Sequence, residues 1–350
     1  MKLIVINYSM SSGSVVFSHQ RDLVFALSQF FDSIEVFTAE TSSEELPKNV
    51  KVHLLPWKIS SPLKNAARIL RTIYPVLVKN RNSIVFTHMT DIHAALISPL
   101  AWILRMRHVL WYAHAKNSKY LLWSSFFVSK IVSSTLGSCN LRFNTKKILF
   151  INQGVRQDLF PYFSRPFQEK RKILYYGRLD PSKNIHLFSK LIDSLNRPKE
   201  HYSLSVYGMP VNPESRDYFL DITTASKPNK TNNAITFNDP ITRKSISGIA
   251  RNFEIFLNLF SGSLDKTLIE ATFMGLAVVT WNREYCMQFG TWSHSPVKET
   301  LEFISGEIVS LRSLRPNDLQ KELARRLELA IRNHSFEAWV DRLVMILRGD

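Results

Sequence analysis

Short apolar runs alternate with helical patterns along this 350-residue chain, and this alternation constrains the fold most strongly. Residues 2–7 (KLIVIN), 33–38 (SIEVFT) and 172–177 (KILYYG) are rich in β-branched and aromatic residues and are predicted to be strands. Amphipathic stretches such as residues 64–80 lie between such runs. Because strands that alternate with helices form parallel sheets covered by helices, the sequence predicts an α/β fold.

The alternation stops once and then begins again. The first series is predicted over residues 1–155 and the second over 173–332, each forming a doubly wound, Rossmann-like domain. The polar, proline-containing stretch 156–172 is predicted to be the linker between them. Within the second series, residues 209–233 are expected to form a long polar loop. Residues 333–350 are expected to form a helix that packs back toward the N-terminal domain.

Composition excludes several classes of protein. Hydrophobic residues at 45% and aromatic residues at 12% exclude general disorder. The two cysteines, Cys139 and Cys286, have no CxxC spacing, which indicates a reducing compartment without a disulfide or zinc framework. Neither GxGxxG nor GxxxxGK occurs, so nothing supports a nicotinamide enzyme or a P-loop NTPase. The apolar run 94–104 is too short to span a bilayer, and MKLIVIN is too short for a signal peptide; a cytoplasmic protein is expected.

Positive charge is concentrated in the N-terminal half. The net charge is +16, of which residues 1–155 carry +11. No acidic residue lies between Asp91 and Asp158. The cations of this stretch are Arg105, Arg107, Lys116, Lys119, Lys130, Arg142, Lys146, Lys147 and Arg156. A field of one sign indicates an anionic partner, namely nucleic acid, a phosphorylated substrate or the acidic face of a membrane. Simple solubility is the alternative.

Polar clusters follow several predicted strands, where open α/β sheets bind ligands. In YYGRLDPSKN, Gly177 permits close approach of the backbone, and Arg178 and Lys183 bracket a turn before a predicted helix. The two cations could converge on a diphosphate, to which the helix N-terminus would add amide donors. The alternative is a solvated basic loop.

A second cluster lies in SGSLDKTLIEATFMGLAVVT, residues 261–280. Asp265 is predicted to be the N-cap of a helix over residues 266–274. Glu270 is the lone acid in its apolar run, and an ionised carboxylate that is buried requires a polar ligand or partner. A ribose diol is such a ligand, because a carboxylate can accept from both hydroxyls. The alternative is a Glu that faces solvent.

Two weaker signals lie in the N-terminal half. His114 ends the predicted strand RHVLWYAH and precedes several cations, so it could hydrogen-bond a sugar or a phosphate. A packed structural histidine is the alternative. Gly13, in the SSGS loop after the first strand, would let backbone amides face a charged group.

Taken in order, these pieces resemble the retaining glycosyltransferases of family 4, which have the fold called GT-B, with two Rossmann-like domains that face each other across a cleft. The resemblance covers nearly the whole chain. It is carried by the glycine loop, WYAH, INQGV, YYGRLDPSKN, YSLSVYG and EIFLNLFSGSLDKTLIEATFMGLAVV. It is strongest to short members from bacterial surface-polysaccharide gene sets (O-antigen, capsule or lipopolysaccharide), where an SLDK variant precedes the EA pair.

The resemblance implies transfer of a sugar from a nucleotide-sugar donor to a saccharide or lipid-linked saccharide, with retention of configuration. Arg178 and Lys183 would hold the donor diphosphate and offset its charge, so that no metal or other cofactor is required. Glu270 would bind the ribose, His114 would lie near the transferred sugar, and Gly13 would lie against the diphosphate or the acceptor. The implied donor-binding residues are Gly13, Gly177, Arg178, Lys183, Gly262, Ser263, Leu264, Asp265, Lys266, Thr267 and Glu270.

The chain departs from the family pattern at three positions. The family usually carries two glutamates separated by seven residues, and here the first of them is Gly262. Asp265 stands where Gly is usual, and Ala277 where Pro is usual. Asp265 or the backbone amides of residues 262–264 are expected to take over the sugar contact. A degenerate protein that binds without turnover is the alternative.

In this family the N-terminal half faces the acceptor. The cations in the N-terminal half of this chain suit a lipid-linked acceptor at an anionic inner-membrane surface, where each Lys or Arg contributes ~1 kcal/mol of binding free energy. The stretch 64–80, with Lys64, Arg68 and Arg71, could lie on the bilayer or pack against the core. A basic nucleic-acid-binding protein is the rival class. No known nucleic-acid-binding module is present. The aromatic residues also lie mostly in apolar runs and are not interleaved with Lys and Arg.

Overall fold

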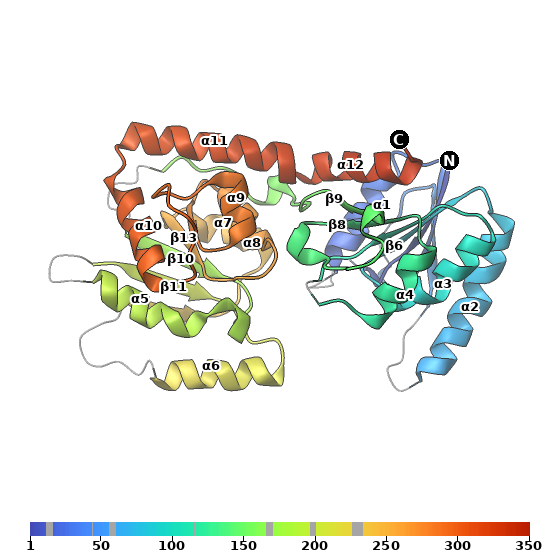
Figure 1. Ribbon diagram of the computed structural model, residues 1–350, viewed down its shortest axis with the longest axis horizontal. Helices are drawn as coiled ribbons and strands as arrows, with labels where there is room; N and C mark the ends of the chain where they lie inside the picture. Colours follow the sequence, from blue (N-terminus) through green and yellow to red (C-terminus); the bar gives the residue numbers. More distant parts are fainter. Residues whose placement is uncertain are drawn as a thin grey trace. The chain divides into compact units, whose positions relative to one another are not determined.

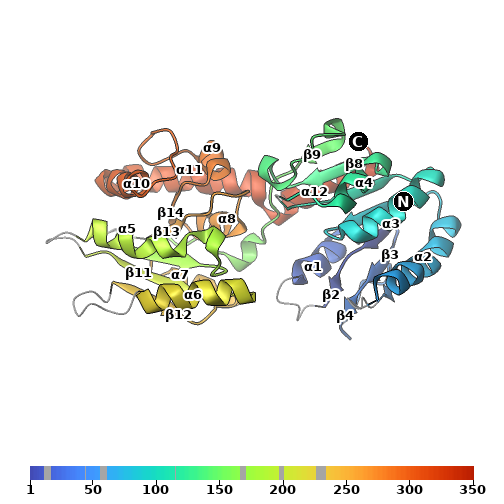
Figure 2. The ribbon, with the colours of Figure 1, turned by 60° about the horizontal axis from the view of Figure 1, so that its bottom comes forward.

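The computed structural model describes residues 1–11, 17–43, 45–55, 61–114, 116–165, 171–196, 201–225 and 234–350. The chain divides into two compact units, one of residues 1–152 with 339–350 and the other of residues 153–338. Each unit contains a parallel sheet with helices packed against it, as Figures 1 and 2 show. The predicted α/β class is therefore confirmed.

In the described part of the first unit, seven parallel strands form a sheet in the order β5-β3-β1-β6-β7-β8-β9. Its strands are β1 Lys2–Ile6, β3 Ser33–Thr38, β5 Val50–Leu54, β6 Ile84–His88, β7 His108–Trp111, β8 Lys130–Ser133 and β9 Ile148–Phe150. Strand β1 lies inside the sheet, with Val5 opposite both Val36 and Phe86. Two short strands, β2 Ser9–Met10 and β4 Glu40–Thr41, pair separately. Strands buried on both faces explain the continuous apolar runs in the sequence.

The helices of the first unit are α1 Ser18–Leu27, α2 Pro62–Lys79, α3 Asp91–Ile103 and α4 Lys119–Phe127. In α2, Ile69, Ile73 and Leu77 recur at helical spacing and are buried in the core. The alternative of a core-facing α2 is thus confirmed, and the exposed Lys64 and Arg71 lie on its outer face. Within the described residues, no helix combines the length and the apolar character needed to cross a bilayer.

The described part of the second unit contains a five-stranded parallel sheet in the order β12-β11-β10-β13-β14. Its strands are β10 Lys172–Tyr176, β11 Ser203–Tyr207, β12 Ile235–Asn238, β13 Ile255–Asn258 and β14 Ala277–Thr280. Its helices are α5 Phe188–Leu195, α6 Pro213–Ala225, α7 Arg243–Ala250, α8 Lys266–Phe273, α9 Arg283–Phe289, α10 Leu301–Ser313 and α11 Pro316–His334. Strand β10 is central and has β13 as its neighbour, which brings two of the sequence motifs to one edge.

Two local predictions in this unit are wrong. Helix α6 occupies part of the stretch expected to be a polar loop. It packs through the partly buried Tyr218 and Phe219 and the buried Ile222, a pattern too sparse to be detected in the sequence. The helix expected directly after the turn of Arg178 and Lys183 begins only at Phe188, because two short 3-10 turns precede it and Asn184 between them has a left-handed backbone with φ of 55°.

Two segments near the ends of the second unit make specific contacts, one within this unit and the other within the first. Arg165, within the stretch expected to be a linker, is buried and donates to the carbonyls of Met274 and Ala250 of this unit. Burial lowers the pKa of Arg165 to about 10. Helix α12 spans Phe336–Arg348, and its residues from Trp339 onward belong to the first unit, where the rings of Trp339 and Trp111 lie 4.9 Å apart.

Candidate functional site

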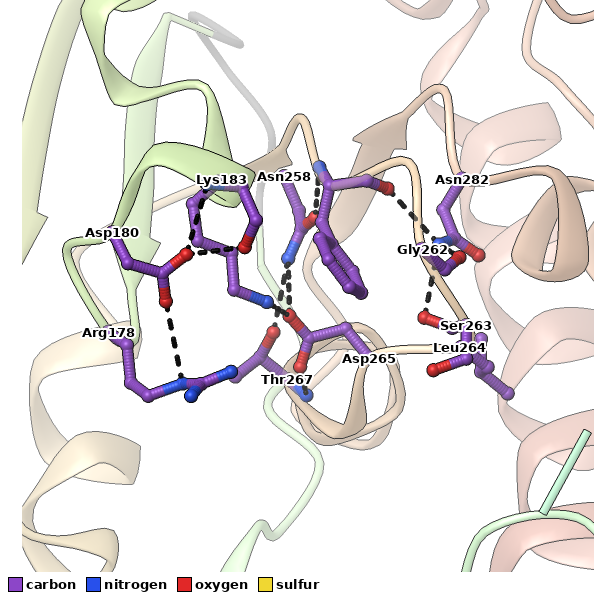
Figure 3. A network of polar contacts seen from close by, with 12 residues as sticks. Arg178, Asp180, Lys183, Asn258, Gly262, Ser263, Leu264, Asp265, Thr267 and Asn282 are labelled. Atoms are coloured by element: carbon purple, nitrogen blue, oxygen red, sulfur yellow. Dashed lines mark hydrogen bonds and ion pairs between the residues drawn. The ribbon is translucent and has the colours of Figure 1, made fainter. Parts of the chain in front are cut away.

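The candidate site lies at the carboxyl edge of the second sheet. Strands β10 and β13 are parallel neighbours, so both end at this edge, where open α/β sheets bind ligands. The segment after β10 contains Arg178 and Lys183, and the segment after β13 leads into α8. Figure 3 shows that the side chains of these two segments form one polar network. The structure therefore brings together the motifs GRLDPSKN and SGSLDKT.

A buried ion pair joins the two segments. The Nζ atom of Lys183 lies 2.5 Å from a carboxylate oxygen of Asp265, and the side chains are only 7% and 15% exposed. The same Nζ lies 3.8 Å from the ring centroid of Phe260, a cation–π contact. Burial acts to raise the pKa of Asp265, but the charge and hydrogen bond of Lys183 outweigh it, so the pKa of this carboxyl is lowered. The charge of Lys183 is thus balanced by Asp265.

Asp265 is also the N-cap of α8. Its second oxygen accepts from the backbone N–H of Thr267 at 3.2 Å, which confirms the predicted cap. Asn258, the last residue of β13, donates from Nδ2 to Asp265 and to the Thr267 hydroxyl, both at 3.2 Å. Lys266 and Thr267 form the partly exposed first turn of the helix. The carboxylate is therefore fully engaged in holding the helix start and Lys183.

Arg178 is the exposed cation of the site. Its side chain is 62% exposed, and its Nε atom lies 3.7 Å from the carboxylate of Asp180. Gly177 directly before it has φ of 148°, in the region that favours glycine. The Tyr175 hydroxyl donates to the Arg178 carbonyl at 2.8 Å and fixes the backbone here. The contact is long and the guanidinium faces water, although Asp180 is only 13% exposed, so the guanidinium can exchange Asp180 for an anionic ligand.

The loop between β13 and α8 is closely packed. Asn282, fully buried, donates from Nδ2 to the carbonyls of Phe260 at 3.1 Å and Gly262 at 2.9 Å. A Cβ atom on Gly262 would lie 2.2 Å from the Phe260 ring, so a side chain at position 262 requires the ring to move. The N–H of Leu264 donates to the Glu284 carboxylate at 2.5 Å. That amide, one of those expected to replace the missing glutamate, is thus already satisfied within the protein.

The remaining candidate residues occupy different surroundings. Glu270 lies on α8 and is 5% exposed, so the alternative of a solvent-facing carboxylate is wrong. Ser263 is partly exposed in the loop before α8. His114 follows β7 in the first unit, where it is exposed, with its ring 5.4 Å from that of Tyr112. The alternative of a packed histidine is therefore wrong as well. Gly13 lies outside the described residues.

Sequence reasoning missed several members of this network, namely Asp180, Asn258, Phe260, Asn282 and Glu284. Asn258 and Asn282 each follow a buried apolar run, and a polar residue at that point was a usable signal. Phe260 gave no signal, because an aromatic residue at the end of an apolar strand is typical of a core. Among the residues that the structure describes, no three His, Cys, Asp or Glu side chains gather as a group that could hold a metal ion.

Comparison with known proteins identifies the fold. No protein-family model matches the chain, and a search of curated proteins also finds no match. Among solved structures, HepE from Anabaena in complex with UDP is similar with a TM-score of 0.73 at 12% identity, over 100% of both chains. Sucrose-phosphate synthase from Thermosynechococcus elongatus has a TM-score of 0.72 at 13% identity, over 99% of this chain and 98% of that one.

A glycosyltransferase from Rickettsia africae has a TM-score of 0.73 at 12% identity, again over 99% and 98% of the two chains. At such identities the similarity concerns the fold. These neighbours are GT-B glycosyltransferases, so the expected GT-B fold is confirmed.

Proposed function

We propose that this chain is a retaining glycosyltransferase that moves a sugar from a nucleotide-sugar donor to a saccharide or lipid-linked saccharide acceptor. One observation carries the proposal. In a unit of GT-B fold, the exposed guanidinium of Arg178 and the start of α8 lie at the carboxyl edge where β10 and β13 end. A helix N-terminus and an arginine fork are both suited to a diphosphate.

The charges of the site support this assignment. Because Asp265 balances Lys183, Arg178 supplies the positive charge that a diphosphate would meet first. Among the described residues, its ion-pair partner is Asp180, and the diphosphate displaces it. As the sugar–phosphate bond breaks, negative charge grows on the departing nucleotide, and Arg178 stabilises it without a metal ion. Glu270 binds the ribose. The acceptor attacks the sugar from the same face that the nucleotide leaves, which retains the configuration without a carboxylate nucleophile.

The wider assignment follows from the resemblance. The acceptor belongs to bacterial surface-polysaccharide assembly, and the enzyme works in the cytoplasm at the inner face of the membrane. His114, exposed in the first unit, contributes to the acceptor or sugar site. HepE is similar in fold and was crystallised with UDP, so UDP is the first nucleotide to test.

Thermal melts with UDP, GDP, ADP and their sugar conjugates, each with and without EDTA, test the donor site. A ligand at 100 times its Kd should stabilise the protein by about 2.7 kcal/mol. We expect one nucleotide to raise the melting temperature despite EDTA, and Arg178→Ala to abolish that shift. Arg216→Ala, which removes an exposed arginine of the same unit, should leave it intact. No shift with any nucleotide would contradict a donor site.

Turnover distinguishes an enzyme from a degenerate binder. Hydrolysis or transfer of the sugar, followed by NMR, reports whether the product keeps the anomeric configuration of the donor. Binding of a nucleotide without turnover toward any saccharide acceptor would favour the degenerate protein that Gly262 suggests.

A further inference from the structure

Helices α3 and α4 of the first unit display large aromatic side chains to solvent. The two helices pack side by side, as the two ribbon views show. Trp102 of α3 is 60% exposed, and Trp123 and Phe126 of α4 are 52% and 57% exposed. Phe127 joins the helices, with its ring 6.0 Å from Trp102 and 5.0 Å from Trp123. We call these four residues, with the exposed Ile103 and Leu122, the α3–α4 patch.

Nothing in the folding of the unit requires this exposure. The indole N–H of Trp123 donates to the Ala95 carbonyl at 3.1 Å, so its polar atom is satisfied within the protein while half of the ring remains in water. Helix α2 differs, because Ile69 and Ile73 face the core and its exposed apolar residues Leu63 and Tyr74 lie eleven residues apart. Clustered apolar side chains at a surface mark an interaction site, whereas single ones are ordinary.

Cations lie at the ends of the two helices that carry the patch. Lys147 donates from Nζ to the Ser125 carbonyl at 2.9 Å and the Phe126 carbonyl at 3.1 Å, at the C-terminus of α4. Lys119 opens α4, and Arg105 follows the end of α3. No acidic residue occurs between Asp91 and Asp158 in the sequence, so α4, β8 and β9 add only positive or neutral groups. Asp91 opens α3 and accepts from the Ser118 hydroxyl at the other end of the helices from Lys147 and Arg105. The patch is therefore apolar at its centre and cationic at its edge.

We infer that the α3–α4 patch docks on an anionic lipid bilayer. Trp and Phe insert at the boundary between headgroups and acyl chains, while lysine and arginine stems extend to the phosphates. A second copy of the chain fits less well, because a symmetric contact would place these cations opposite one another. The inference rests on the proposed function only for its purpose, which is to bring the first unit to a lipid-linked acceptor.

Vesicle flotation tests the inference without any donor. The full chain should float with vesicles of phosphatidylcholine and phosphatidylglycerol, and less with phosphatidylcholine alone or at high salt. Phe126→Ser should weaken binding by about tenfold, as expected for one buried aromatic side chain. Leu63→Ser and Tyr74→Ser remove exposed apolar side chains of α2 and are the matched controls, expected to bind like the parent chain.

Trp123→Ser removes a hydrogen bond to Ala95 as well as the ring, so its fold is checked by circular dichroism and its effect is read beside that of Phe126→Ser. Brominated lipid should quench Trp fluorescence in the parent chain and less in Trp102→Phe.

Three results would overturn the inference: no flotation with anionic vesicles at low salt, equal loss in the α2 controls, or a concentration-dependent dimer that Phe126→Ser dissociates. A failure to bind nucleotides would leave these results unchanged, so the two proposals fail separately.

Discussion

Removing the charge of Asp265 tests whether its pair with Lys183 is a buried ion pair in energetic terms. Removing one partner of such a pair costs about 3–5 kcal/mol, because the other charge stays buried without compensation. Asp265→Asn keeps an oxygen that can accept from the Thr267 N–H, so it isolates the charge. Asp265→Ala also loses the N-cap, worth about 1 kcal/mol more. For Asp265→Asn, a cost of 3 kcal/mol corresponds to a fall of about 6–12 °C in the melting temperature.

The measurement is urea unfolding combined with hydrogen exchange of peptides from α8, which reports the second unit separately from the first. Asp318→Asn is the matched control. It breaks the exposed Arg315–Asp318 pair of the same unit and should cost less than about 1 kcal/mol. Lys183→Met completes a double-mutant cycle, in which the double variant should be more stable than the sum of the two single losses predicts. Equal losses of unfolding free energy in Asp265→Asn and Asp318→Asn would refute the claim that Asp265 and Lys183 behave as a buried ion pair.

Three further predictions address the loop before α8, Glu270 of α8 and two buried histidines of the first unit. Gly262→Glu should destabilise the second unit, because its Cβ would lie 2.2 Å from the Phe260 ring, and adding Phe260→Ala should recover much of the loss in urea unfolding. Glu270→Gln should weaken binding of the active nucleoside diphosphate by about tenfold, the loss of a hydrogen bond to a charged group, without changing the affinity for inorganic pyrophosphate in calorimetry. Burial lowers the pKa of His93 to about 4 and that of His108 to about 3. Below about pH 6.5 these two imidazoles therefore bind protons in the unfolded chain but not in the folded chain. As the pH falls, the free energy of unfolding decreases by about 1.4 kcal/mol per pH unit for each histidine. His108→Asn should halve this slope in urea unfolding between about pH 6 and pH 5, and an unchanged slope would contradict the assignment.

The regular elements could be predicted because their signals are local. A buried parallel strand such as β13 appears as an apolar run, and the start of α8 appears as Asp265 before a helical pattern. Helix α6 and the start of α5 could not be predicted, because they depend on contacts made after folding. Asn184, for example, donates from its side chain to the carbonyl of Leu259, far along the chain, at 2.9 Å.

The candidate site shows the same division. Arg178 and Lys183 could be found from their place after a strand, and the structure does bring that segment to α8. The different exposure of the two side chains could not be predicted from the sequence. Lys183 is enclosed by Asp265 and Phe260, whereas Arg178 is exposed, and only the pairing of β10 with β13 decides which cation meets the carboxylate.

Positions 262 and 265, where the chain differs from the family 4 pattern that it resembles, are physically connected. Gly262 leaves room for the Phe260 ring, that ring covers the ammonium of Lys183, and the ammonium is paired with Asp265. A glutamate at 262 would displace the ring, and without Asp265 the covered ammonium would lack a counter-charge. Gly262 is therefore one part of a coupled arrangement of packing and charge, and a glutamate introduced there alone would disturb Lys183.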